Sequence, residues 1–182
     1  MCTSVHPQFS HCGIYARDID AQIDFYTKVV GLIVADRGYS ETARHEFVFL
    51  TASPEHHHQV VFISGRGKNV ASTVNQLSFK VADLDQLKAM YRRAQDYGIK
   101  EIRQICHGNA LSFYIADPEG NGIEVYTDTP WYIPQPHGVS IDLSRPADEI
   151  MATTEKHCRE TPGFLTLDAW KAEVANRLAH TP

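Results

Sequence analysis

Residues 11–20 read HCGIYARDID, and residues 76–85 read QLSFKVADLD. The two stretches follow one plan at an offset of 65 residues: a polar leader, an apolar alternation, and a first aspartate seven residues after the leader. Similarity at a fixed offset within one chain indicates repeated structural units. The sequence therefore predicts two related modules, at about residues 9–63 and 74–127.

Each module is expected to begin with a strand and a helix. In the first copy, the alternation of Ile14 and Ala16 indicates the strand. Asp18 or Asp20 can cap the following helix, and Gly31 can end it. The second copy repeats this pattern. Three strand-like stretches follow each helix, at residues 32–36, 46–50 and 59–63 in the first copy and at 102–105, 112–115 and 122–126 in the second.

Neither module could bury its sheet face alone, because a small sheet needs a second layer for stability. We therefore expect an α+β fold in which the two modules pair into a curved, mainly antiparallel sheet, with the helices outside and a concave pocket inside. The polar leaders and the last strands of both modules should face this pocket. Residues 64–75 are rich in Gly, Ser and Asn and fit a connector, and the domain is expected to span residues 1–129.

The remaining tail, residues 130–182, has a different pattern. The stretch TDTPWYIPQPHG at residues 127–138 contains three prolines, which oppose regular structure. Two helices are expected after it, at about residues 146–159 and from Thr166 towards residue 178. We expect this tail to be either a packed cover or an oligomer contact. Trp131 and Tyr132 could form a lid over a substrate or anchor the tail.

Composition limits the possible partners. The 182 residues carry 17 basic and 22 acidic side chains, a net charge of −5, so there is no basic excess for nucleic acid. No apolar run approaches the roughly 20 residues of a membrane span, and the first residues lack a secretory pattern, so a cytoplasmic protein is expected. Four cysteines, at 2, 12, 106 and 158, show no paired spacing and are expected to be reduced thiols.

A small set of polar residues stands at matching positions of the repeat. His11 leads the first copy and Gln76 leads the second. Glu124 interrupts an apolar strand, and because an unpaired buried carboxylate is costly, it should be paired, protonated or metal-bound. The repeat places Gln59, beside His58, at the equivalent point of the first copy.

These side chains would converge on the pocket from four strands. A histidine, a carboxylate and an amide oxygen with open positions suit a divalent ion such as Fe(II), Mn(II) or Zn(II), and leave room for substrate oxygens. The alternative is that His11 and Gln76 are hydrogen-bonded strand ends and that Glu124 forms a buried pair. His56 and His57 are expected to be solvated.

The stretch ICHGNALSFYIADPEGNGIE, residues 105–124, adds a motif. It resembles the signature of type I extradiol ring-cleavage dioxygenases: a histidine, a tyrosine, Asp-Pro-x-Gly and a glutamate. With the opening around His11 and the stretch DFYTKVVG at residues 24–31, the chain resembles the vicinal oxygen chelate superfamily, which includes glyoxalases and bleomycin resistance proteins. The resemblance spans about residues 9–129 and is to the small, single-domain kind of dioxygenase.

The resemblance implies roles for individual residues. His11 and Glu124 match metal ligands, and His58 falls near the acid/base histidine. Tyr114 and His107 match residues that contact the substrate. The second metal histidine of the dioxygenases is replaced by Gln76, a residue type that serves as a ligand in some glyoxalases.

The activity implied is ring cleavage of an aromatic diol with O₂ at an Fe(II) site, as in aromatic compound catabolism, by a homodimer. Two alternatives share the fold. One is a metal-dependent lyase or isomerase using Zn(II), Ni(II) or Mn(II), for which Gln76 and Gln59 would be unexceptional ligands. The other is a non-catalytic protein that binds a small molecule between apolar and aromatic walls.

Overall fold

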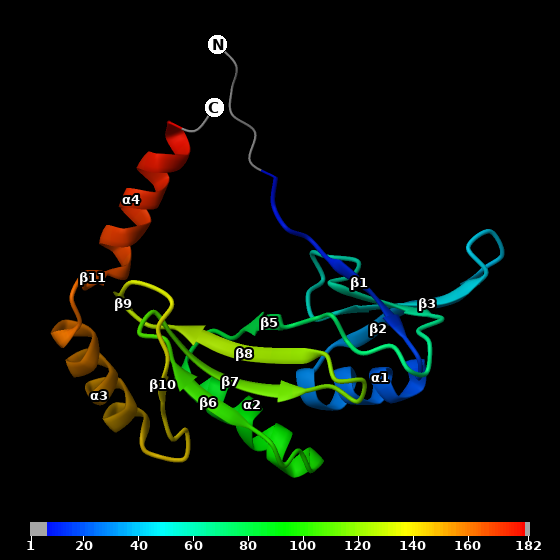
Figure 1. Ribbon diagram of the computed structural model, residues 1–182, viewed down its shortest axis with the longest axis horizontal. Coiled ribbons are helices and arrows are strands. Elements are labelled where there is room, and N and C mark those ends of the chain that lie inside the picture. Colours follow the sequence, from blue (N-terminus) through cyan, green and yellow to red (C-terminus); the bar gives the residue numbers. More distant parts are fainter. Residues whose placement is uncertain (1–6, 181–182) are drawn as a thin grey trace.

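The computed structural model describes residues 7–180, so Cys2 lies outside the described residues. The chain has the predicted α+β fold (Figure 1). The elements of the first module are β1 Cys12–Ala16, α1 Ile19–Phe25, the π-helical turn η1 Tyr26–Val30, β2 Ile33–Ser40, β3 His45–Thr51 and β4 Val60–Ser64. Those of the second are β5 Leu77–Lys80, α2 Leu84–Tyr97, β6 Arg103–Cys106, β7 Ala110–Ala116 and β8 Gly122–Asp128. The predicted order of strand, helix and three strands is confirmed in both modules.

The helix ends follow the predicted chemistry. The Asp18 side chain accepts a hydrogen bond from the third residue after it and caps α1, and Asp83 caps α2 in the same way. Gly31 and Gly98 adopt left-handed conformations where the two helical segments end. The π-helical turn was not expected. It begins next to Thr27, whose hydroxyl donates to carbonyls of the preceding turn and competes with the regular helical bonds.

The two modules form separate sheets, where a single curved sheet was expected. Their strand orders are β1-β4-β3-β2 and, with one strand added from the tail, β10-β6-β7-β8-β5. In each module the first and last strands pair in parallel and the other pairs are antiparallel, so the repeat extends to the hydrogen bonding. Figure 1 shows the first module beside the end of the second, with α1 and α2 lying along the same side.

Alternation along the strands gives each sheet a buried and an open face. In β7 and β8, Phe113 and Val125 are buried in the main hydrophobic core, to which residues of α2 also belong. Tyr114 and Glu124, one position away, therefore project from the opposite face. This second face carries the polar residues of the motif.

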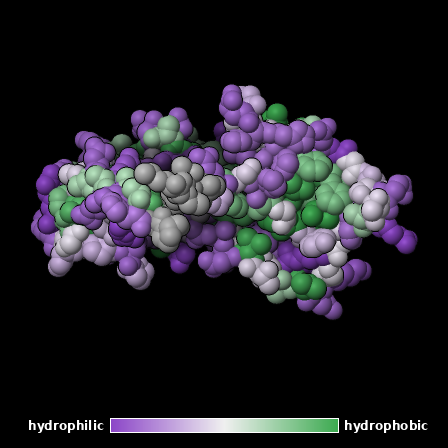
Figure 2. Space-filling model, turned by 90° about the horizontal axis from the view of Figure 1, so that it is seen from above, coloured by the Kyte–Doolittle hydropathy of each residue, from purple (hydrophilic) through white to green (hydrophobic). Residues whose placement is uncertain are grey.

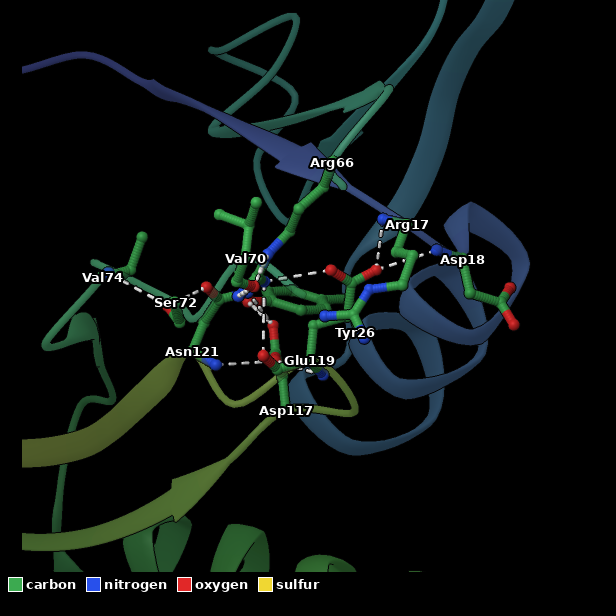
Figure 3. Close-up of polar contacts among 10 residues, drawn as sticks. All are labelled: Arg17, Asp18, Tyr26, Arg66, Val70, Ser72, Val74, Asp117, Glu119 and Asn121. Atoms are coloured by element: carbon green, nitrogen blue, oxygen red, sulfur yellow. Dashed lines mark hydrogen bonds and ion pairs between the residues drawn. The ribbon is translucent and has the colours of Figure 1, made fainter. Parts of the chain in front are cut away.

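A polar cluster joins the two modules, and we call it the module junction (Figure 3). The Glu119 carboxylate accepts hydrogen bonds from the backbone N–H groups of Arg17 and Asp18, at the start of α1. Glu119 also pairs with Arg66 at 3.0 Å, and both side chains are at most 6% exposed. Asp117, two residues earlier, accepts a hydrogen bond from the Tyr26 hydroxyl. The turn before β8 is thus fixed to the first module.

The tail contributes β9 Trp131–Tyr132, β10 Val139–Ser140, α3 Ala147–Glu160, β11 Leu165–Thr166 and α4 Leu167–Ala179. The two short strands in and after the proline-rich stretch correct the expectation that it has no regular structure. They form because Val139 and Ser140 pair with β6, and the other short strand pairs with β11. Both expected helices are present, and Thr166 caps the second.

The tail packs on the second module through α3. Ile150 belongs to the main core, while Cys158 and Trp131 belong to a smaller cluster between α3 and the loop. Tyr132 stacks on Trp170 of α4. The aromatic pair therefore anchors the tail, which is the second of the two roles considered for it. The three described cysteines are free.

The surface differs between the two halves of the molecule. Figure 2 shows hydrophobic surface spread over the half that holds the first module. Ile33 is 65% exposed there, Tyr39 59% and Tyr15 55%. Within residues 7–180, no helix combines the length and the apolar character needed to cross a membrane.

Candidate functional site

Glu124 lies at the centre of a hydrogen-bonded group on the open face of the second sheet. The strand register sets Glu124 of β8 directly between Ser78 of β5 and Tyr114 of β7. Ser78 Oγ donates to Glu124 Oε2 at 2.6 Å, and Gln76 Nε2 donates to the same oxygen at 3.0 Å. The Tyr114 hydroxyl donates to Oε1. Both carboxylate oxygens are therefore partnered.

The charge of Glu124 has no full counterion. Glu124 is 8% exposed, and within the described chain no lysine or arginine forms an ion pair with its carboxylate. Among the described residues, the one basic side chain within 4.0 Å is His107, whose Nε2 lies 3.9 Å from Oε1. Neutral donors alone compensate poorly for the desolvation of a carboxylate. The site thus has the electrostatic character of one that can accept a cation.

His107 is fixed by the tail. Its Nδ1 lies 2.6 Å from the carbonyl oxygen of His137, and because a carbonyl can only accept, Nδ1 carries a proton. Its Nε2 lies 2.7 Å from the Tyr114 hydroxyl. The Gln135 side chain donates to the His107 carbonyl at 2.7 Å. The proline-rich loop therefore orients this ring through the His137 carbonyl and holds its backbone through Gln135.

Tyr114 connects His107 and Glu124 and stays protonated. Burial, and then the hydrogen bond to Glu124 and its charge, raise the pKa of the Tyr114 phenol well above its ordinary value. The phenol is therefore a hydrogen-bond donor at neutral pH. His107, Tyr114 and Glu124 together form a continuous hydrogen-bonded series.

This series borders a hollow of about 340 Å³, which the second module and the tail form. The hollow is large enough to hold part of a small organic molecule. It is lined by Gln76, His107, Asn109, Ala110, Tyr114, Glu124, Tyr126 and Gln135.

The first module carries a separate histidine cluster. The rings of His11 and His58 lie 4.3 Å apart. His58 Nδ1 lies 2.9 Å from His57 Nδ1, and His57 Nε2 lies 2.6 Å from Asp36. Burial, followed by the charges of His11 and His57, lowers the pKa of His58 below its ordinary value. His57 is exposed, as expected, and also takes part in this cluster.

The four polar residues that were expected to converge do not all meet within one copy of the chain. Gln76 and Glu124 meet, whereas His11 and His58 lie with the histidine cluster and do not line the hollow. The reason is that the two modules form separate sheets. The Gln59 side chain accepts a hydrogen bond from the Ala52 N–H at 2.9 Å, which ties it to its own turn. Among the residues that the structure describes, no three His, Cys, Asp or Glu side chains form a metal cluster.

Three residues of the site were not expected from the sequence. Ser78 follows Gln76 by two positions, so strand alternation alone could have placed it on the same face. Gln135 and His137 lie in a proline-rich loop, and no pattern in the sequence indicates that they contact His107. Their role depends on how the tail packs.

The donors fit a divalent ion in their chemistry. Glu124 supplies a carboxylate, and the Gln76 amide beside it can present its oxygen by a half turn about its last bond. His11 would be the imidazole ligand, although it lies on the first module. A carboxylate, an amide oxygen and an imidazole together suit a first-row divalent ion.

Comparison with known proteins gives a family and several relatives. A model of the Glyoxalase/Bleomycin resistance protein/Dioxygenase superfamily matches residues 8–125. "Biphenyl-2,3-diol 1,2-dioxygenase 3" from Rhodococcus globerulus is 28% identical over 130 residues, which make up 69% of this chain and 65% of that protein. The match thus spans slightly less than two thirds of that relative's length.

Solved structures share the fold. The glyoxylase/bleomycin resistance protein/dioxygenase domain from Frankia sp. EAN1pec aligns with a TM-score of 0.58 and 19% identity, over 69% of this chain and 100% of that one. The fosfomycin resistance protein FosX from Listeria monocytogenes, complexed with Mn(II) and sulfate ion, aligns with a TM-score of 0.53 and 13% identity, over 69% and 95%. At these identities the likeness concerns the fold alone.

Proposed function

The chain belongs to the Glyoxalase/Bleomycin resistance protein/Dioxygenase superfamily, and on this basis we propose that it is a metal-dependent dioxygenase that cleaves the ring of an aromatic diol with O₂. The observation that carries the proposal is the hydrogen-bonded series of His107, Tyr114 and Glu124 beside one hollow. The ring-cleavage motif includes all three of these residues. The similarity to a biphenyl diol dioxygenase supports the same activity.

The metal site of the proposal consists of His11, Gln76 and Glu124. Fe(II) is the ion we favour, with Mn(II), Zn(II) and Ni(II) as alternatives. A bound divalent ion would orient the two oxygens of the diol and stabilise negative charge on them. The buried Glu124 carboxylate, which has no lysine or arginine partner within residues 7–180, supports this assignment.

The neighbouring side chains would bind and orient the substrate. When Glu124 serves as a ligand, the Tyr114 hydroxyl becomes free to donate to a substrate oxygen. His107, held through Nδ1 by the tail, presents Nε2 towards the same position and can form a hydrogen bond with a substrate oxygen. His58, whose pKa is lowered mainly by burial, is a neutral imidazole near pH 7 and can act as an acid/base group.

We propose that a cytoplasmic homodimer completes the site. The ligands are divided, with His11 on the first module and the other two on the second. The exposed aromatic surface around Tyr15 and Tyr39 on the first module would pack against the open second-module face of another copy. This would bring His11 of one copy towards Glu124 of the other and add His58 to the hollow.

Complementation tests this arrangement. His11→Ala and Glu124→Gln should each abolish activity, while a mixture of the two variants should regain part of it, because a mixed dimer retains one intact site. Light scattering after gel filtration checks the dimer directly. A monomer that is fully active would contradict the shared site.

Oxygen-free reconstitution tests the activity itself. Protein loaded with Fe(II) is mixed with a panel of diols, including biphenyl-2,3-diol, and then exposed to air while the visible spectrum is recorded. A yellow ring-fission product is expected with the native chain and not with Glu124→Gln. Glu155→Gln, an equivalent change on the surface of α3, is the control. If iron binds and no diol yields such a product, the dioxygenase proposal is wrong.

A lyase or isomerase activity is the second candidate, and Gln76 favours it. An amide oxygen is a weaker ligand for Fe(II) than imidazole, and Gln is a ligand type of some glyoxalases of the superfamily. Activity that survives in air with Zn(II) or Ni(II), without consumption of O₂, would support this candidate over the first.

A further inference from the structure

A row of side chains crosses the open face of the second sheet and continues beyond Glu124. Arg103 of β6 pairs with Tyr114 of β7, Tyr114 with Glu124 of β8, and Glu124 with Ser78 of β5. Neighbouring strands lie about 4.8 Å apart, so the backbone at Arg103 is about 10 Å from that at Glu124. Tyr114 stands between the cation and the carboxylate.

Arg103 is held in place without an anionic partner. Its guanidinium carbon lies 4.7 Å from the centre of the Tyr114 ring, a cation–π contact. Within residues 7–180, no carboxylate forms an ion pair with Arg103, whereas Arg37, Arg66, Arg145 and Arg159 each have at least one such partner. A guanidinium that rests on a ring face keeps its N–H groups free to bind a carboxylate.

A second hollow adjoins the one at Glu124. It has a volume of about 610 Å³, and Lys100 and Arg103 are the basic residues of its lining. Glu101 is the one acidic residue there. Tyr114 lines both hollows. A ligand lying over Tyr114 could therefore reach the Glu124 group at one end and the two basic side chains at the other.

We propose that Arg103, with Lys100 beside it, binds a carboxylate of the substrate, so that the natural diol carries an anionic substituent at the end of the ring remote from Glu124. This inference rests on the proposed dioxygenase function and narrows its substrate class. A catechol bearing a carboxylate would place its diol at the metal ligands and its charge at Arg103. A neutral biaryl diol would leave the guanidinium unpaired.

Binding to a matched pair of ligands tests the proposal without turnover. Fe(II)-loaded protein is titrated calorimetrically in the absence of oxygen with 3,4-dihydroxybenzoate and with its neutral amide, which has nearly the same shape. The native chain should bind the carboxylate about tenfold more tightly, a preference that added salt reduces. Arg103→Met should remove this preference, and Arg103→Lys should retain part of it.

The control is Arg92→Met, which removes an exposed arginine from α2 and should leave the preference unchanged. Equal binding of the two ligands to the native chain, or an equal loss of both in Arg103→Met, would overturn the proposal. Benzoate and benzamide, which lack the diol, separate this inference from the proposed function. If the chain prefers carboxylates to amides but binds diols no better than ligands without a diol, the Arg103 site stands and the dioxygenase proposal is rejected. If it prefers diols but binds carboxylates and amides equally, only the Arg103 site is rejected. No heat with any of the four ligands would overturn both.

Discussion

Tyr114 stands directly opposite Glu124 in the antiparallel register of β7 and β8, and its hydroxyl donates to that carboxylate. The same hydroxyl contacts His107, which is fixed by the tail. One phenol oxygen therefore links the carboxylate that we assign to the metal with the histidine that we assign to the substrate.

Replacing Tyr114 by Phe should reduce catalysis far more than stability. The variant keeps the ring that supports Arg103 and loses only the hydroxyl, so the free energy of unfolding should change by about 1 kcal/mol. We expect kcat/KM for the best diol to fall by about a hundredfold, within the range typical of a lost proton-transfer or orienting group. Steady-state kinetics and urea unfolding measure the two effects.

Tyr97→Phe is the control, because it removes a surface hydroxyl that donates to Asp24 far from the hollow. Its kcat/KM should match that of the native chain. A Tyr114→Phe variant with native kinetics would remove the phenol from the mechanism.

Gln76→His should strengthen iron binding. Imidazole is a better donor for Fe(II) than an amide oxygen, and the side chain already lies beside Glu124. We expect Fe(II) affinity to rise about tenfold, equivalent to about 1.4 kcal/mol, as measured by competition with a chelator under nitrogen. Gln95→His, on the exposed side of α2, controls for nonspecific binding to an added histidine. Unchanged or weaker binding in Gln76→His would argue against residue 76 as a ligand.

Glu119→Gln should destabilise the module junction strongly. It leaves the buried Arg66 guanidinium without its anionic partner and weakens the acceptor for the two N–H groups at the start of α1. Breaking such a buried pair costs about 3–5 kcal/mol, which urea unfolding can measure.

An exposed pair provides the comparison. Glu155→Gln removes the partner of Arg159 on α3, where both side chains are solvated, and should cost about 0–1 kcal/mol. If the two glutamine variants unfold at the same urea concentration, the junction does not stabilise the fold as described.

The contact between His137 and His157 predicts a pH dependence of stability. Burial, and then the charges of His157 and His107, lower the pKa of His137 below its ordinary value of 6.5. The unfolded chain lacks these effects, so between the two pKa values it binds more protons than the folded state. The contribution to stability is therefore fully present above pH 6.5 and is lost as the pH falls towards the folded pKa.

His137→Asn should reduce this loss. The difference in urea midpoint between about pH 7.5 and about pH 5.5 should be smaller in the variant than in the native chain. The substitution keeps the backbone carbonyl that accepts from His107. His56→Asn, in the exposed β3–β4 loop, is the matched control, and an identical change in both variants would refute the assignment.

Local chemistry explains which parts of the fold could be predicted. Asp18 and Asp83 act within three residues of themselves, so their capping role is readable from the sequence. Strand alternation likewise places Tyr114 and Glu124 on one face. These predictions depend only on neighbours along the chain or on regular geometry.

The placement of His11 depends on distant contacts and could not be predicted in this way. Its position relative to Glu124 follows from how the two modules meet, and the contacts made there, such as that between Arg66 and Glu119, join residues 53 positions apart. The Gln59 side chain accepts a hydrogen bond from the backbone of its own turn and therefore does not join Gln76 and Glu124. Repeat symmetry identifies equivalent positions, but it does not determine how far apart they lie.

The two hydrogen bonds that join His107 to residues 135 and 137 give the tail a wider significance. The family match ends at residue 125, before either of these groups. A protein shortened to that boundary would retain every residue of the ring-cleavage motif and yet lose the carbonyl that accepts from His107 Nδ1, which leaves the ring held through Tyr114 alone. Relatives that share the motif and differ in their last fifty or so residues could therefore differ in substrate preference, since each extension would set that ring in its own way.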